Sequence, residues 1–320
     1  MICRGRGAMG ARGDQGNRDS IRSGRRTFAP AVLRLAVALA FLTGATGSAA
    51  AGMRVASTAV CADQFPLALA DPGDIVGISV LGHDPAVSAL AGRATTIPTL
   101  KADAETYLTA GADMVIGAEH GDTKTIVMLQ RVGVQVLRVP SRNDFPEMMD
   151  QLATVGGRMG LPQAGRALAD GTDRRLSAVR ARTAGPPVVA AYYRPDGGSA
   201  GHGTFVDAEM RAGGYESLAS HLGQSGWGRL DLETLVMHPP QAMVIAFFDR
   251  ASVGISRRFT EHPAFRKMLS DVPVIAIPGA ATACGNWTLV DGVEFLAATR
   301  GASALAASRP SPAPAGGGAP

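Results

Sequence analysis

The sequence predicts an α/β fold of two lobes, each with a mostly parallel sheet flanked by helices, bridged by one long helix. Two observations carry this prediction. Short apolar, β-branched runs alternate with helical patterns in both halves of the chain, and residues 144–185 between them carry helical patterns without a strand. Strands that alternate with helices of this size favour parallel sheets covered on both faces.

Residues 52–143 are predicted to form the N-terminal lobe. Apolar runs predict strands at the following positions: 54–58, 75–79, 114–117 and 134–139. Helices are expected between them at 62–70, 103–110 and 123–131. Asp103 and Asp122 stand where helix N-caps belong, and Gly111 and Gly133 stand just past the helix ends.

Residues 144–185 are predicted to form a helical segment that joins the lobes. The pattern breaks at Gly160-Leu-Pro162, and a second helix then runs from Gln163 to about Thr183. At about 1.5 Å per residue this helix is roughly 30 Å long, enough to span from one lobe to the other. Gly185-Pro-Pro187 ends it.

Residues 186–300 repeat the alternation and predict the C-terminal lobe. The expected strands lie at 188–193, 243–248 and 272–277, and the expected helices at 204–212, 231–237, 263–269 and 289–300. Residues 301–320 are rich in Ala, Ser, Pro and Gly, a composition that predicts a disordered tail.

Residues 1–51 are predicted to be a signal peptide that is cleaved. Arginines dominate the first 35 positions, an apolar run follows at 35–42, and Ser48-Ala-Ala-Ala51 provides the small residues of a cleavage site. The apolar run is shorter than the 18 or more residues that a spanning helix needs. Arg25-Arg26 also resembles a twin-arginine export signal, so either export route fits. The basic excess ends with this segment, which argues against nucleic-acid binding.

Cys61 and Cys284 are the cysteines of the predicted mature chain. Two cysteines in an oxidising compartment predict one disulfide, and two buried thiols are the alternative.

Several segments of the chain resemble a known family. Arg54-Val-Ala-Ser57 and Cys61-Ala-Asp-Gln64 are similar to the start of the helical-backbone substrate-binding proteins of ABC importers for cobalamin and ferric siderophores. Gly226-Trp-Gly-Arg-Leu230 and Thr282-Ala-Cys-Gly-Asn-Trp287 resemble the second lobe of a cysteine-containing branch. The resemblance covers about residues 54–300, although Gln135 replaces the usual proline.

This resemblance implies a periplasmic, soluble, monomeric protein without an intrinsic cofactor. Its ligand, a corrinoid or a ferric siderophore, is expected in the cleft between the lobes. The protein is expected to dock on an importer permease through an acidic residue of each lobe, for which Asp63 is the candidate in the first lobe and Asp207 or Glu209 in the second. Asp63 could equally be an acidic residue that stabilises the helix dipole.

The candidate ligand residues lie in loops that follow the predicted strands, where parallel sheets place their ligands. They are His83, Glu119, His120, Tyr193, Arg194, His202 and Trp287. Trp287 and Tyr193 would offer apolar faces to a chelate, and Arg194 would pair with its carboxylate or catecholate. Alternatively, His83, Glu119, His120 and His202 could hold bare zinc or manganese, and solvated loops remain the simplest interpretation.

Catalytic motifs are missing from the sequence. It contains no nucleophile elbow, phosphate loop or dinucleotide fingerprint in a strand-turn-helix context. The sequence therefore predicts a binding protein rather than an enzyme, with an exported hydrolase as the alternative.

Overall fold

The computed structural model describes residues 52–119, 123–247 and 262–307. The predicted signal peptide therefore lies outside the described residues, as do His120 and the last thirteen positions. Among the described residues, no helix has the length and apolar character needed to cross a membrane.

The first lobe is built on a parallel sheet with the strand order β2-β1-β3-β4. Its strands are β1 (Val55–Ser57), β2 (Ile75–Gly77), β3 (Met114–Ala118) and β4 (Gln135–Val139). Successive side chains of a strand point to opposite faces. Met114 and Ile116 accordingly join a core with α1 (Val60–Leu69), whereas Val115 joins one with α2 (Ala104–Thr109) and α3 (Thr123–Arg131).

Short 3₁₀ turns follow the first helix and the second strand. They are η1 (Pro72–Asp74), η2 (Val80–His83) and η3 (Ala91–Arg93). The sequence did not predict them, because a single 3₁₀ turn has no hydrophobic period to detect.

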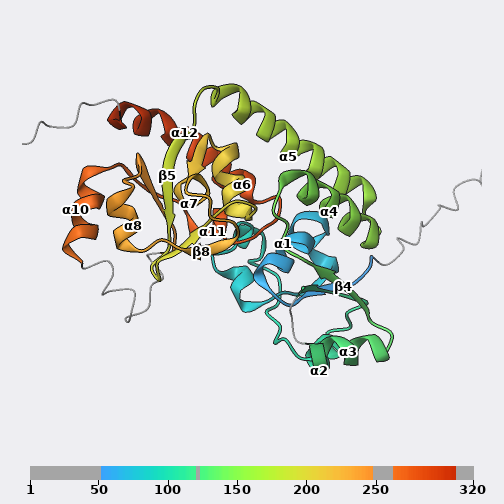
Figure 1. Cartoon of the computed structure of the whole chain (residues 1–320). Coiled ribbons are helices and arrows are strands. Elements are labelled where there is room, and N and C mark those ends of the chain that lie inside the picture. The colour runs from blue at the N-terminus through green and yellow to red at the C-terminus, as the bar shows by residue number, and fades with distance from the viewer. Residues whose placement is uncertain (1–51, 120–122, 248–261, 308–320) are drawn as a thin grey trace, which may run out of the picture. The chain divides into compact units, whose positions relative to one another are not determined.

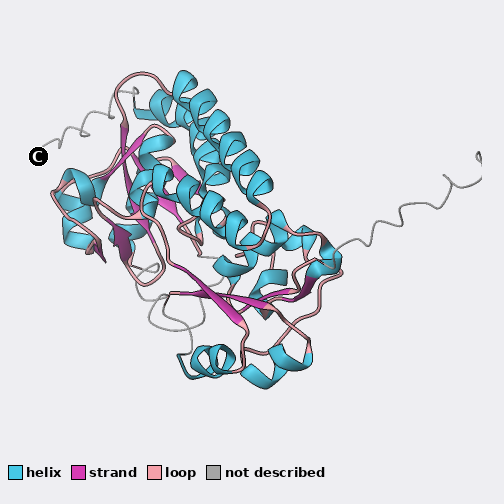
Figure 2. Ribbon diagram, turned by 90° about the vertical axis from the view of Figure 1, so that its right-hand side faces the viewer, coloured by secondary structure: helices cyan, strands magenta, loops and turns pink. Residues whose placement is uncertain are grey.

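The bridging segment consists of α4 (Phe145–Arg158) and α5 (Pro162–Arg182), which lie side by side (Figure 1 and Figure 2). Ala169, in the first half of α5, belongs to the first-lobe core, whereas Leu176 and Val179 pack against α12 (Leu289–Ala307) of the second lobe. The prediction of one long helix that joins the lobes is confirmed.

The second lobe is built on another parallel sheet, with the strand order β10-β9-β5-β7. Its strands are β5 (Val188–Tyr193), β7 (Tyr215–Ser217), β9 (Ala242–Ile245) and β10 (Val274–Ala276). α6 (Phe205–Ala212) and α12 share a core with one face of this sheet. α7 (Leu218–His221), α8 (Leu232–Met237) and α10 (Pro263–Asp271) pack against the other face.

The second lobe differs from the sequence-based expectation in several features, among them the unpredicted β7 and α7. Gly198 and Ser199, expected in a loop, belong to β6 (Gly198–Ala200), which pairs antiparallel with β8 (Trp227–Arg229). The short helix α11 (Gly279–Thr282) follows β10. α12 continues to Ala307, past the predicted boundary at Arg300, because residues 301–307 include four alanines and a leucine, which favour helix.

Candidate ligand-binding site

The segment after β2 forms the exposed edge of the first lobe. Ser79 precedes η2, whose Val80 and Leu81 are 69% and 42% exposed. His83 ends this turn, and its Nε2 is buried without a hydrogen-bond partner among the described residues. This segment therefore presents apolar surface to solvent. It follows the carboxyl end of β2, which is the end at which parallel sheets bind ligands.

Arg194 and Phe247 occupy the equivalent edge of the second lobe. Arg194 follows β5, and Phe247 lies two residues past the end of β9, the strand paired with β5. The guanidinium carbon of Arg194 lies 5.5 Å from the centroid of the Phe247 ring, within the range of a cation–π interaction. Phe247 has φ 63°, and it is the one non-glycine residue with positive φ in the described part of the chain. Such strain often marks a functional site.

The two edges meet at Gly279, the first residue of α11. A Cβ on Gly279 would lie 2.5 Å from the carbonyl oxygen of Ala86 and 2.9 Å from Cε1 of Phe247. Ala86 follows His83 by three residues. Phe247 and the segment after η2 therefore approach the same point.

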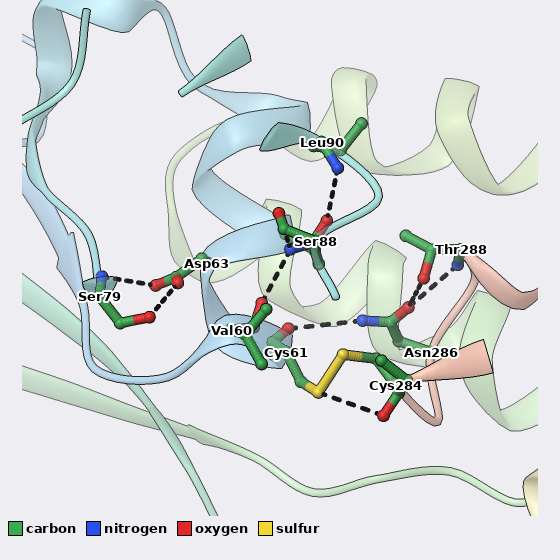
Figure 3. Close-up of a disulfide and its surroundings, with 11 residues drawn as sticks. Val60, Cys61, Asp63, Ser79, Ser88, Leu90, Cys284, Asn286 and Thr288 are labelled. Carbon is green, nitrogen blue, oxygen red and sulfur yellow. Dashed lines mark hydrogen bonds between the residues drawn. A yellow bond between two sulfur atoms is a disulfide. The ribbon is translucent and has the colours of Figure 1, made fainter. Parts of the chain in front are cut away.

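A second contact between the lobes surrounds a disulfide. Cys61, in the first turn of α1, is bonded to Cys284, between α11 and α12, as predicted (Figure 3). Asn286 Nδ2 donates to the carbonyl oxygen of Cys61 at 3.4 Å, and the Arg142 amide donates to the carbonyl oxygen of Gly285 at 2.8 Å. The segment from Cys284 to Asn286 is thus held directly against the first lobe.

Trp227 lies beside this second contact. Its ring is 5.1 Å from that of Phe205, centroid to centroid, in an edge-to-face arrangement, and 50% of the residue is exposed. A Cβ on Gly285 would lie 2.9 Å from Cδ1 of Phe205 and 2.8 Å from the carbonyl oxygen of Arg142. Phe205, which packs on the exposed indole of Trp227, and the backbone of Arg142 thus approach the same glycine. From the sequence, Trp227 was notable only as part of a segment that resembles the family.

Trp287, predicted to offer an apolar face to a ligand, is buried. It is 5% exposed, belongs to the first-lobe core, and its ring lies 4.7 Å from that of Phe65. Trp287 packs between the lobes against Phe65 of α1. The sequence alone does not reveal this contact, because the two residues are far apart in the chain.

The remaining predicted ligand residues differ in accessibility. Tyr193 is buried against Phe265, and burial raises the pKa of its hydroxyl. Its side chain therefore has little surface for a ligand. Glu119 is exposed and accepts a hydrogen bond from Arg138 through its backbone carbonyl. The side chain of His202 is 71% exposed, with Nδ1 3.7 Å from Oδ2 of the buried Asp207.

The three acidic residues predicted to dock on a permease are buried, so this prediction is corrected. Asp63 accepts hydrogen bonds from Ser57 and Ser79. Asp207 accepts from Ser220 and Arg211. Glu209 accepts from Thr282, and burial raises the pKa of Glu209 well above its ordinary value. Each carboxylate forms its hydrogen bonds inside the protein and is not accessible to a partner protein.

The alternative of a bare metal ion finds no support in the described residues. No group of three or more His, Cys, Asp or Glu side chains there could hold an ion. His120, one of the four proposed ligands, lies outside the described residues. A hollow of about 820 Å³ between α2 and α3 contains none of the residues that follow the strands.

Comparison with known proteins identifies the family. Residues 55–268 match the family described as periplasmic binding protein, and this match spans more than half of the chain. The chain belongs to the periplasmic binding protein family. No curated protein matches it.

Several solved structures share this fold. The periplasmic heme-binding protein RhuT of Roseiflexus sp. RS-1, in its apo form, is 20% identical with a TM-score of 0.64, covering 80% of this chain and 100% of its own. HutB of Vibrio cholerae, a periplasmic heme-binding protein, is 18% identical with a TM-score of 0.63, covering 78% of this chain and 98% of its own. CeuE of Helicobacter pylori with bound Ni(II) is 14% identical with a TM-score of 0.60, covering 80% of this chain and 85% of its own.

Proposed function

We propose that the protein is exported to the periplasm, binds a metal chelate there and delivers it to the permease of an ABC importer. The family supports ligand binding as the activity, and we propose binding without catalysis. The chelate class comprises the corrinoids and ferric siderophores expected from the sequence, to which the names of the structural relatives add heme.

The side chains on the two facing edges favour a chelate over a bare ion as the ligand. Val80 and Leu81 on the first lobe and Trp227 on the second expose apolar and aromatic surface. Arg142, whose guanidinium also lies 4.0 Å from a carboxylate oxygen of Glu147, and Arg194 are beside the two contacts between the lobes. Apolar surface cannot coordinate a bare cation, and arginines would repel it. A macrocycle or siderophore has apolar faces and anionic groups that match both.

A thermal-shift panel tests this proposal. The mature protein from Gly52 is mixed with cyanocobalamin, cobinamide, hemin, a ferric catecholate, a ferric hydroxamate, zinc chloride or manganese chloride. A ligand that binds only the folded state at 100 times its Kd stabilises it by about 2.7 kcal/mol. We expect at least one chelate to raise the melting temperature. Stabilisation by zinc or manganese alone, or by nothing in the panel, would contradict the proposal.

Export is tested separately by N-terminal sequencing of the periplasmic fraction. We expect the mature chain to begin close to Gly52. Recovery of the uncleaved chain in the cytoplasm would contradict the proposed location.

A further inference from the structure

Asp63 is a buried carboxylate that connects the ends of two strands. It lies in the first turn of α1 and is fully shielded from solvent. Oδ1 accepts hydrogen bonds from Ser57 Oγ at 2.5 Å and from the Ser79 amide at 3.2 Å. Oδ2 accepts from Ser79 Oγ at 2.5 Å, and Figure 3 shows Ser79 turned toward the carboxylate. Ser57 ends β1, and Ser79 precedes η2.

The turn η2 packs directly on this carboxylate. A Cβ on Gly82 would lie 2.5 Å from Asp63 Oδ2 and 2.7 Å from Cδ1 of Ile78. The backbone of η2 therefore approaches Asp63 at a distance that only glycine permits. With its inner side fixed in this way, η2 holds Val80 and Leu81 exposed.

We infer that Asp63 is a positioning residue for ligand binding, which holds η2 so that Val80, Leu81 and His83 form the first-lobe half of the ligand surface. This inference rests on the proposed function. Ionised groups are rarely buried unless they are paired or hydrogen-bonded, because burial disfavours the charged form. Here burial raises the pKa of Asp63 to about 6. An apolar side chain would avoid this penalty but could not accept three hydrogen bonds from two strand ends.

The hydrogen bonds from Ser57 and Ser79 affect the pKa of Asp63 more than its electrostatic interaction with His83 does, so we expect the hydrogen bonds, rather than the charge, to hold η2. His83 and Tyr107 are the titratable groups that interact electrostatically with Asp63 among the described residues. An amide in place of the carboxylate can still accept from Ser57 and from the Ser79 amide, and it can donate to Ser79 Oγ. Asparagine should therefore restore much of what alanine loses.

The experiment compares Asp63→Ala with Asp63→Asn, using hemin and cyanocobalamin as probes. The first measurement is hydrogen exchange of residues 79–83 in the ligand-free protein, and the second is the Kd for each probe. In Asp63→Ala we expect exchange in this segment to accelerate and affinity to fall at least about tenfold, which corresponds to 1.4 kcal/mol. Asp63→Asn should recover most of both losses.

Leu152→Ala is the matched control. Leu152 is buried in the same core, on α4, and its truncation destabilises the lobe while leaving the hydrogen bonds from Ser57 and Ser79 to Asp63 in place. We expect a lower melting temperature, with the Kd and the exchange of residues 79–83 close to wild type. If Asp63→Ala does not fold, Ser79→Ala removes one of the three hydrogen bonds and should weaken binding in the same direction.

The inference is overturned if Asp63→Ala leaves both exchange and Kd unchanged, or if Asp63→Asn loses as much affinity as Asp63→Ala. Failure of wild-type protein to bind either probe would count against the proposed function with these chelates. The exchange measurement needs no ligand, so it decides separately whether Asp63 fixes η2.

Discussion

The two tryptophans of the chain lie in opposite environments and should respond differently to truncation. Trp227 is half exposed beside Phe205, whereas Trp287 is buried against Phe65. We expect Trp227→Ala to weaken binding of hemin or cyanocobalamin by at least about 1 kcal/mol with little change in melting temperature. Trp287→Ala should instead destabilise the fold by about 3–5 kcal/mol. Titration calorimetry and urea denaturation separate the two effects. Equal loss of affinity in both variants, after correction for the unfolded fraction, would contradict this assignment.

The sequence could not distinguish these tryptophans. Both stand close to glycines in the sequence, and both belong to segments that resemble the family. Their environments depend on partners distant in sequence, Phe65 for Trp287 and Phe205 for Trp227. The same limit applies to Asp63, Asp207 and Glu209, which were predicted to be exposed and are buried. The cysteine pair was predictable, because a two-cysteine mature chain allows one pairing.

Asp63 also makes a predictable contribution to the pH dependence of stability. Its pKa in the folded state is about 6, mainly because of burial, against an ordinary value of 3.8. The folded state therefore binds the proton more tightly than the unfolded state. This stabilisation is complete below about pH 4 and is lost as the pH rises through about 6, with a total change of roughly 3 kcal/mol.

Asp63→Asn should remove this contribution. The difference in unfolding free energy between the variant and wild type is expected to shift in favour of the variant, by roughly 3 kcal/mol, between about pH 4 and about pH 7. Urea denaturation of both proteins at matched pH values measures this difference. The contributions of carboxylates with lowered pKa, such as Asp103 and Glu294, are the same in both proteins and therefore cancel. A difference that stays constant with pH would show that Asp63 titrates normally.

At the scale of secondary structure, α4 and α5 depend on two glycines at their contact. A Cβ on Gly165 would lie 2.6 Å from the carbonyl oxygen of Leu152 and 3.1 Å from Cα of Gly156. Both neighbours are backbone atoms, so the helices would have to separate. We expect Gly165→Ala to destabilise the protein by about 1–3 kcal/mol, as overpacking typically does.

Gly157→Ala is the control for this substitution. Gly157 is exposed in α4, and a Cβ there meets nothing within 4 Å. Alanine should stabilise this helix by about 0.5–1 kcal/mol relative to glycine. The melting temperature should therefore fall for Gly165→Ala and rise for Gly157→Ala. A stabilising Gly165→Ala would mean that the helices adjust at no cost.

The long elements could be predicted from the sequence because their signals are local. α5 was expected from Gln163 to about Thr183 and spans Pro162–Arg182, and β5 has the expected bounds. The strands β6, β7 and β8 were not predicted. Each has three residues and is defined by its pairing with a distant segment, so no internal period reveals it. The short helix α11, which brings Gly279 to Ala86, was hidden for the same reason.

At the scale of the whole molecule, the disulfide closes a loop of more than two hundred residues, since Cys61 and Cys284 are 223 positions apart. A crosslink over so long a loop restricts the unfolded chain strongly. Its removal is expected to cost about 2–5 kcal/mol of stability. The double variant Cys61→Ser, Cys284→Ser should therefore melt at a lower temperature than the oxidised wild type. Titration of free thiols in the denatured, non-reduced wild type should find none in the mature chain.

The lobes should nevertheless stay together when this bond is absent. Trp287 remains within the first-lobe core, the Arg142 amide still meets the Gly285 carbonyl, and Arg175 of α5 pairs with Asp291 and Glu294 of α12. These contacts are formed only in the folded state and do not depend on the sulfur atoms. We expect small-angle X-ray scattering to give the same radius of gyration for the double variant and for the oxidised protein at a temperature where both are folded. An expanded variant would mean that the disulfide alone holds the lobes in contact, and that the buried Trp287 is too weak an anchor to keep the ligand-binding edges facing each other.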